Sequence, residues 1–572
     1  MINPDLARIF YELADILEMQ KVQWKPAAYR KAARAIESLP EDIGEVYAKR
    51  GKDGLMEISG VGEGLAAKIV EYLTTKRIKE YDELKKKIPR HLSALIDISG
   101  LGPKRAELLH KKLGINDIND LKKAIAQHKL AKLEGFGVKS EENIARGLEL
   151  YAQGTVRMTL GVALPITEAL VSQLRQAKGI GKIEVAGSVR RRKETIGDID
   201  ILMTSKDPKP VMERFVHLPD IKRVLAKGQT KSSILLKNNL QVDCRVLDEK
   251  SYGAALNYFT GSKEHNVALR EIAIKKGYKL SEYGLFDRKT ERFVCGRTED
   301  EVYKKLGLHY IPPELRENTG EIAAAKDGKL PVLVEEKDIR GDLHMHTTYS
   351  DGNNTVDEMA RAAQQRGYDY IAITDHSKSV HIAHGMEEKR LLKLIEEVRK
   401  VQRRFPHLRI LAGSEVDILP DGSMDYPDRV LKQLDYVIGS VHSGFKMSRQ
   451  QMTERICKAM ENPYVRAIGH PTGRLINRRD PYDVDIETIF RTAKKTGTFL
   501  EVDATPERLD FKDTHIRAAV DAGVKLVIDS DAHDANQLRY MSFGVMQARR
   551  GWATKKDIAN CFPLEKFLKE KK

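Results

Sequence analysis

The sequence predicts a multidomain protein of α+β and α/β parts: a helical N-terminal region, a mixed middle region and a C-terminal, distorted βα barrel. In about the first 150 residues, apolar residues recur at helical spacing between short glycine turns. From about residue 181, short strand-like runs alternate with charged turns. Beyond residue 338, strands alternate with long helical segments, which favours parallel strands with crossover helices. At 572 residues the chain is also too long for a single core.

The composition narrows the class of partner and the compartment. A formal net charge of +15 favours a polyanionic partner, although a basic protein without such a partner also fits it. Four cysteines without CxxC spacing exclude a disulfide framework and a thiolate zinc site, and they predict a cytoplasmic protein. The N-terminus does not resemble a signal peptide, and no apolar run reaches the roughly 20 residues of a membrane span, so we expect no membrane partner.

Three segments of the N-terminal region share one pattern: 58–69, 98–109 and 133–144 each place an apolar residue before Gly-x-Gly and an amphipathic helix after it. The glycines permit tight turns whose backbone N–H groups can hold a DNA phosphate without reading a base. One copy could simply end one helix and start the next, but three copies in a basic context favour DNA. The pattern resembles the helix-hairpin-helix motif of non-specific DNA-binding proteins. The glycines expected at DNA are Gly60, Gly62, Gly100, Gly102, Gly135 and Gly137.

Three aspartates of the middle region predict a metal site. Asp198 and Asp200 project to one face of a strand, and Asp243 lies in a strand that can pair alongside. Convergent carboxylates suit two divalent ions, Mg²⁺ or Mn²⁺, that bridge a nucleoside triphosphate and a primer 3′-hydroxyl. Ser188 and Arg191 would hold the outer phosphates. An isolated Asp-x-Asp is more often a solvated strand edge, so the prediction depends on the combination of these residues.

The order GSVRR, GDID, VDC and YFTGSKEHNVALR closely resembles family X DNA polymerases, over about residues 1–317. The resemblance implies a nucleotidyltransferase palm with a thumb, in which Asp198, Asp200 and Asp243 bind the catalytic metals. It also implies a set of residues around the incoming nucleotide and the template. These are Gly187, Ser188, Arg191, Gly197, Tyr258, Phe259, Gly261, Asn266 and Arg270.

A second activity is implied near the N-terminus. Residues 28–36 and the first glycine hairpin resemble the small lyase-type domain of that family. Lys68 aligns with the family's Schiff-base lysine, which opens abasic sugars by β-elimination. Because Lys68 lies on a lysine-rich amphipathic helix, a phosphate-contacting or solvated lysine is an equally good interpretation. Lyase activity is therefore a hypothesis.

Nine histidines and carboxylates of the C-terminal region lie almost all at the ends of predicted strands. In a βα barrel such ends converge on one mouth, and imidazole combined with carboxylate favours Zn²⁺, Mn²⁺ or Fe²⁺ over Mg²⁺. The array resembles the polymerase-and-histidinol-phosphatase (PHP) domain, a phosphoesterase barrel with three metal ions, Mn²⁺ or Zn²⁺. The ligands implied are His344, His346, Asp351, His376, Glu415, His442, His470, Asp531 and His533.

Several residues near this array receive other expectations. Asp375 is expected to orient a ligand from outside the metal shell. His381 and His384 are expected in a loop near the mouth, and Arg474 is expected to contact a substrate phosphate. Asp503 lies near the expected mouth without an assigned role.

Together these patterns predict six segments: a lyase-like domain (1–85), a second helix-hairpin-helix domain (86–150), a palm (151–245), a thumb (246–320), a linker (321–338) and a PHP barrel (339–572). The resemblance implies a polymerase that uses dNTPs to fill short gaps in base excision repair, acting on gapped or nicked DNA. Nothing in the sequence suggests an obligate oligomer, so we expect a monomer. It also implies a barrel that trims 3′ ends as a 3′→5′ exonuclease, with incision of abasic sites and removal of 3′ blocking groups as further activities. Two alternatives stay open: a DNA-binding scaffold with a decayed polymerase site, and a small-molecule phosphatase.

Overall fold

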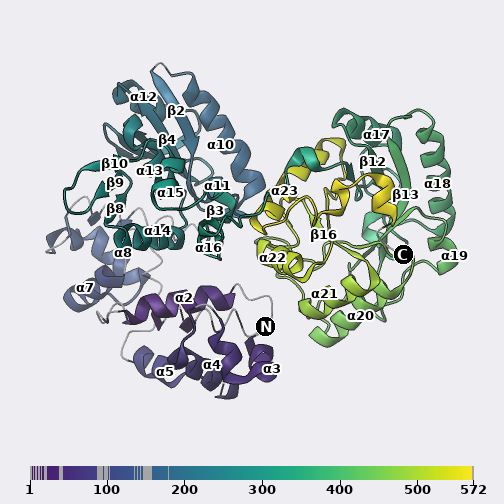
Figure 1. Cartoon of the computed structure of the whole chain (residues 1–572), viewed down its shortest axis with the longest axis horizontal. Coiled ribbons are helices and arrows are strands. Elements are labelled where there is room, and N and C mark those ends of the chain that lie inside the picture. Colours follow the sequence, from purple (N-terminus) through teal and green to yellow (C-terminus); the bar gives the residue numbers. More distant parts are fainter. Residues whose placement is uncertain are drawn as a thin grey trace. The chain divides into compact units, whose positions relative to one another are not determined.

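The computed structural model divides into two compact units, Met1–Val156 and Arg157–Lys572 (Figure 1). Within the described residues, no helix combines the length and the apolar character needed to cross a membrane. The residues that the structure describes are 3, 6, 9, 10, 13, 14, 16, 17, 22, 24–37, 43–58, 60–75, 77–86, 95, 101, 103–133, 136, 137, 140, 141, 144, 145, 148, and 157–569 without 178.

The N-terminal unit is helical, as predicted. Its apolar side chains form two clusters, one within residues 6–81 and one within residues 95–148. Each cluster is small, and the helices cover it with one face while lysines and glutamates occupy the other. The helices are α2 (Lys25–Glu37), α3 (Ile43–Met56), α4 (Glu63–Thr75), α5 (Lys79–Lys86), α7 (Pro103–Leu113) and α8 (Ile118–Ala126).

The second unit begins with a five-stranded sheet in the order β2-β4-β7-β6-β5. The strands are β2 (Ile180–Val185), β4 (Asp198–Ser205), β5 (Ile221–Lys227), β6 (Lys231–Leu236) and β7 (Gln241–Leu247). Helices α10 (Leu160–Arg175) and α12 (Pro208–Val216) pack on one face, against Ile199, Ile201 and Met203 of β4. Helix α13 (Tyr252–Thr260) packs on the other face, against Leu202. Since side chains alternate along a strand, Asp198 and Asp200 lie on the face of α13.

The thumb continues from α13 into α14 (Lys263–Lys275), the small sheet β8 (Tyr278–Ser281), β9 (Gly284–Asp287) and β10 (Phe293–Cys295), and α15 (Glu299–Lys305). The segment expected as a linker is itself folded, with α16 (Glu321–Lys326) inside it. Ala325 and Leu333 are buried in the same apolar cluster as Trp552. The charged, alanine-rich composition of residues 321–338 gives no sign in the sequence that one face of this segment is buried.

The C-terminal part is a nearly closed barrel of seven parallel strands in sequential order, which confirms the predicted fold class. The ends of the sheet meet through a parallel bridge between Met345 and Ala532, and the His346 N–H donates to the Ala532 carbonyl over 2.8 Å. Figure 1 shows the helices around the strands. The strands are β11 (Gly341–Asp342), β12 (Tyr370–Ile373), β13 (Arg409–Asp417), β14 (Tyr436–Ser440), β15 (Ala467–Ile468), β16 (Phe499–Asp503) and β17 (Leu526–Asp529). The main helices are α17 (Val356–Gln365), α18 (Glu388–Gln402), α20 (Arg449–Glu461), α21 (Ile486–Thr496), α22 (Asp513–Ala522) and α23 (Met541–Arg550).

Candidate active sites

The palm brings the three predicted aspartates together on one sheet face. Strands β4 and β7 are parallel neighbours, and their register places Asp200 opposite Asp243. Burial, followed by repulsion from Asp198 and Asp243, raises the pKa of Asp200 to about 7. Burial and Asp243 also raise the pKa of Asp198. The fold therefore concentrates negative charge that divalent cations would neutralise, and oxygen donors are the ligands that Mg²⁺ prefers.

The glycine turn before these strands lies directly against the carboxylates. Gly187 has a φ of +62°, and a Cβ built on it would lie 2.8 Å from Oδ2 of Asp200. Only glycine therefore allows the turn to approach so closely. The hydroxyl of the next residue, Ser188, is buried and makes no hydrogen bond within the described part of the chain. A buried donor without a partner is costly, so this hydroxyl fits a position that awaits a phosphate oxygen. A Cβ on Gly197 would lie 2.9 Å from a guanidinium nitrogen of Arg157, which is the far end of a flexible side chain and can move aside.

The residues expected around the nucleotide lie on α13, α14 and the turn that joins them. The Tyr258 and Phe259 rings meet edge to face at 5.1 Å, and the Arg245 guanidinium lies 4.4 Å from the centre of the Phe259 ring. Asn266 donates to the Tyr258 carbonyl over 2.6 Å, and Arg270 donates to the Asn266 carbonyl over 3.3 Å. These contacts hold the set together, while the nucleotide contacts themselves stay a prediction.

Arg191 has a partner that sequence reasoning missed. Its Nε donates to Oε1 of Glu317 over 3.0 Å, and another guanidinium nitrogen donates to the Thr260 carbonyl. A Cβ on Gly261 would lie 3.0 Å from that nitrogen, so Arg191 lies against the turn between α13 and α14. Nothing local in the sequence signals this pairing, because 126 residues separate Arg191 and Glu317.

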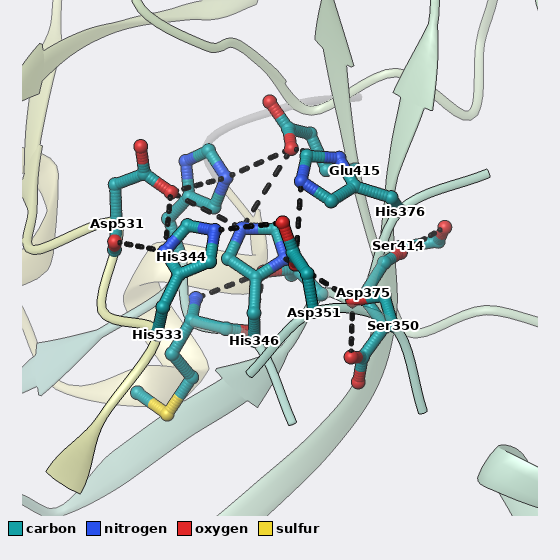
Figure 2. Close-up of polar contacts among 12 residues, drawn as sticks. His344, His346, Ser350, Asp351, Asp375, His376, Ser414, Glu415, Asp531 and His533 are labelled. Atoms are coloured by element: carbon teal, nitrogen blue, oxygen red, sulfur yellow. Dashed lines mark hydrogen bonds and ion pairs between the residues drawn. The ribbon is translucent and has the colours of Figure 1, made fainter. Parts of the chain in front are cut away.

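In the barrel, the nine predicted ligands converge at the strand ends. Figure 2 shows how His344, His346, Asp351, His376, Glu415, Asp531 and His533 lie around one centre. Eight of them fall into three overlapping groups whose ligand atoms lie within 4.8 Å of one another. The ninth, His470, places Nε2 2.9 Å from Oε1 of Glu415. The three groups are His346, Asp351, His376 and His533; His344, His346 and Asp531; and His376, Glu415 and His442.

The chemistry of this donor set fits bound cations. The His346 ring stacks on His376 at 4.3 Å and on His533 at 4.2 Å. Burial, with the charges of His533 and His376, lowers the pKa of His346 to about 3, so its imidazole is neutral and able to ligate. Nε2 of His344 and Oε2 of Glu415 are buried 3.4 Å apart, yet neither makes a hydrogen bond within the described residues. Imidazole nitrogens and carboxylate oxygens that converge in this way are the donor types that bind transition-metal ions.

Carboxylates behind the predicted ligands contact their other atoms and so orient them. Oε1 of Glu501 lies 2.6 Å from Nδ1 of His344, and Oε2 of Glu501 accepts the His470 N–H over 2.5 Å. Asp417 lies 3.3 Å from Nδ1 of His442. Asp375 accepts hydrogen bonds from Thr347 and Ser350, and its expected role in orienting a ligand stays a prediction. Sequence reasoning missed Glu501 and Asp417, although Asp417 follows Glu415 by two residues and so shares its strand face.

The structure argues against the expected substrate contact of Arg474. This side chain is buried, and it donates to Glu194 over 2.7 Å and to the carbonyls of Arg508 and Leu509. The arginine beside the metal ligands is instead Arg508, whose Nε lies 3.8 Å from Oδ2 of Asp531 and 3.4 Å from Oδ2 of Asp503. Asp503, which the sequence analysis left without a role, is thus a buried partner of Arg508.

His381 begins the short helix of residues 381–383, His384 follows it, and both side chains are exposed. Neither residue belongs to the three candidate ligand groups found among the described residues. Their expected place near the mouth stays a prediction.

The N-terminal unit places Lys68 on α4, where its Nζ is paired with the Glu80 carboxylate. The Tyr29 hydroxyl donates to the same carboxylate over 2.9 Å. Lys68 must therefore leave Glu80 before it can attack an abasic sugar.

The first glycine turn has Gly60 at a φ of +86°, which matches the expected hairpin geometry. Gly62 precedes α4, and its carbonyl accepts the Leu65 N–H over 3.0 Å. In the third hairpin, the Gly137 carbonyl accepts the Ser140 N–H over 2.8 Å. Gly100, Gly102 and Gly135 lie outside the described residues.

Family models match five segments of the chain. They are a helix-hairpin-helix domain (1–78), a SAM-like helix-hairpin-helix tandem (92–149), a DNA polymerase beta palm (165–274), a DNA polymerase beta thumb (255–317) and a PHP domain (342–505).

Three curated relatives show how these segments combine. The chain is 39% identical over 575 residues, and over all of both chains, to the DNA polymerase/3′-5′ exonuclease PolX of Bacillus subtilis (strain 168). It is 28% identical to DNA polymerase lambda of Rattus norvegicus, over 53% of this chain and 54% of that protein. It is 31% identical to a probable phosphatase of Thermoanaerobacter sp. (strain X514), over 40% of this chain and 95% of that protein.

The palm, thumb and barrel thus define a DNA polymerase joined to a metallophosphoesterase-type domain. The chain belongs to the family X DNA polymerases that carry a C-terminal PHP domain.

Proposed function

We propose that this polymerase fills short gaps in base excision repair, with Asp198, Asp200 and Asp243 holding Mg²⁺ or Mn²⁺. The observation that carries the proposal is the register of β4 and β7, which places the carboxylates together. Burial, with repulsion from Asp198 and Asp243, raises the pKa of Asp200 to about 7. Bound divalent cations would activate the primer 3′-hydroxyl and neutralise the leaving pyrophosphate. The helix-hairpin-helix segments would hold the DNA backbone on either side of the gap.

The chain's own residues would bind and orient the nucleotide. The unpaired Ser188 hydroxyl would donate to a phosphate oxygen, and the Arg191 guanidinium would hold the outer phosphates. Tyr258 and Phe259 would pack against the sugar, with the Phe259 ring fixed beneath Arg245. Asn266 and Arg270 would face the nascent pair and the template from α14.

For the barrel, we propose 3′→5′ exonuclease activity with three Mn²⁺ or Zn²⁺ ions. Within the described residues, Nε2 of His344 and Oε2 of Glu415 are buried and make no hydrogen bond, which supports metal binding. The name of the B. subtilis relative supports the nuclease reaction. Asp351 and His533 are the more exposed ligands, at 29% and 30%, and mark the side from which a DNA end would enter. Incision of abasic sites and release of 3′ blocking groups would use the same site.

Shortening of a 5′-labelled duplex in Mn²⁺ tests the nuclease proposal. We expect His346→Ala to abolish shortening and His384→Ala, a matched change at an exposed histidine, to leave it intact. Equal loss in both variants, or shortening that persists in His346→Ala, would contradict the assignment.

A second candidate for the barrel is hydrolysis of small phosphate monoesters. The 31% identity to a probable phosphatase favours it. The rates at which the wild type hydrolyses a small phosphate monoester and a DNA 3′ end distinguish the phosphatase from the nuclease. The nuclease proposal predicts preference for DNA, and a preference for the monoester supports the phosphatase.

Lyase activity of Lys68 is a further proposal. Borohydride should trap the wild type on an abasic 5′ end, because the amine forms a Schiff base with the opened sugar. Lys68→Ala should lose the adduct. Lys52→Ala, which removes another lysine of the same unit, should keep it. Equal adducts in both variants would contradict a role for Lys68.

We also propose a monomer in the cytoplasm with gapped or nicked DNA and dNTPs as its partners. The described cysteines, Cys244, Cys295, Cys457 and Cys561, are all free thiols, which supports a reducing compartment. Sedimentation equilibrium at a mass of 64.7 kDa tests the monomer.

A further inference from the structure

One arginine of the barrel reaches the proposed nucleotide site of the palm. Arg550, the last residue of α23, has a side chain that is only 2% exposed. One of its guanidinium nitrogens donates to the Arg191 carbonyl over 2.7 Å and to Oε1 of Glu317 over 3.1 Å. The other terminal nitrogen donates to Asp513 over 2.5 Å, so Arg550 is itself fixed from the barrel side.

Glu317 is shared between two arginines. The same Oε1 accepts from Arg550 and from Nε of Arg191. Although burial opposes ionisation, Arg550, Lys193 and Arg191 hold the pKa of Glu317 below its usual range, so the carboxylate is charged. In this structure, therefore, the guanidinium expected at the triphosphate is occupied by a carboxylate.

A triphosphate and Glu317 thus compete for Arg191. When Arg191 turns toward phosphate, Glu317 loses a partner while its side chain is only 21% exposed. A carboxylate left unpaired in such a position is costly, so its release of Arg191 depends on another cation. Arg550 supplies that cation without moving, because it already donates to the same oxygen over 3.1 Å, whereas Nζ of Lys193 lies 4.0 Å away.

We propose that Arg550 is a positioning residue for nucleotide binding, through which the PHP barrel sets the affinity of the palm for dNTPs. Its guanidinium neutralises Glu317 and thereby makes Arg191 available to the triphosphate. Its hydrogen bond to the Arg191 carbonyl fixes the end of the short helix Gly187–Arg190, which carries Ser188. This inference rests on the proposed role of Arg191 in binding the triphosphate.

The test compares steady-state gap filling by Arg550→Ala and Arg549→Ala. Arg549 lies on the same helix but binds Glu314 and the Val334 carbonyl instead, so it is a matched control. We expect Arg550→Ala to raise KM for dNTP roughly fivefold or more with little change in kcat. Arg549→Ala should leave KM unchanged, and both variants should keep 3′ shortening.

Removal of the competing carboxylate separates positioning from general stability. Glu317→Gln should lower KM below the wild-type value, and Arg550→Ala/Glu317→Gln should lose most of the increase caused by Arg550→Ala. An unchanged KM in Arg550→Ala, or an increase that Glu317→Gln fails to relieve, would overturn the inference. A KM that rises in Glu317→Gln would overturn it even if Arg550→Ala does not fold. A wild type that incorporates no nucleotide would instead refute the proposed function.

Discussion

The palm and the barrel differ in the type, the number and the burial of the residues that they offer to a metal ion. The palm offers three carboxylates from two neighbouring strands of an open sheet, and none of the three is fully buried. The barrel gathers nine donors from all around its mouth, and six of them are buried. An open oxygen site leaves positions for substrate phosphates, whereas a buried imidazole–carboxylate site supplies most ligands itself. We therefore expect metal to reach the palm together with the substrate, and metal in the barrel to stay bound to the folded protein.

We expect the largest change in activity when a single carboxylate of the palm is removed, because gap filling should fall while 3′ shortening stays. Asp243→Ala should lower gap filling by at least about 100-fold, because the strand opposite Asp200 loses its metal-binding oxygens. Shortening of the 3′ end should stay at the wild-type rate. Primer extension and shortening measured on one labelled duplex check both. A parallel loss of the two activities would break the comparison.

Within the barrel, Glu501→Gln should lower nuclease activity about 10- to 100-fold, because Glu501 fixes the ring of His344 and the backbone of His470. The effect should come with weaker metal retention, measured by elemental analysis after gel filtration. Glu507→Gln, in the segment that follows β16, is the control and should behave as wild type. Full activity in Glu501→Gln would show that the second carboxylate shell is dispensable.

The palm and the barrel should also differ in how firmly they retain metal ions. After gel filtration in metal-free buffer, the barrel should keep Mn²⁺ or Zn²⁺ and the palm should keep no Mg²⁺. Elemental analysis of the wild type and of His344→Ala/His346→Ala measures this, and the bound metal should fall in the variant. Retained metal that is unchanged in the variant would contradict the buried barrel site.

The smallest expected effect concerns stability of the metal-free palm. The pKa of Asp200 is raised from 3.8 to about 7, so the folded state binds the proton more tightly than the unfolded state. The ionised carboxylate therefore destabilises the fold increasingly as pH rises from 3.8 toward about 7, and the penalty is complete above that value. In a chelator, Asp200→Asn should raise the thermal midpoint by a few degrees near neutral or alkaline pH and lose this advantage in acid. If the thermal midpoint of Asp200→Asn exceeded that of the wild type most in acid, the result would contradict a raised pKa of Asp200.

The sequence was most informative where function and fold use the same residues. Parallel strands with crossover helices were predicted for the barrel, and six of its seven strands lead into a predicted ligand, because parallel strand ends meet at one mouth. Strand β16 is the exception, since it holds Glu501, which sequence reasoning missed. Edge strand β5 was not predicted, because Lys222, Arg223 and Lys227 interrupt its apolar residues and most of it is exposed. Arg474 was misplaced because its partner, Glu194, is 280 residues away. Long-range ion pairs leave no local pattern, and the link from Arg550 to Arg191 is of the same kind.

We expect this one chain to carry two metal sites that act on DNA and can be inactivated separately. The most direct measurement incubates an end-labelled duplex with a one-nucleotide gap in Mn²⁺ or Mg²⁺, with and without dNTPs. Asp198→Ala/Asp200→Ala should lose extension alone, and His344→Ala/His346→Ala should lose 3′ shortening alone. A wild type that shortens but never extends would leave the palm as a DNA-holding scaffold. A wild type that does neither, but hydrolyses small phosphate esters, would contradict the account.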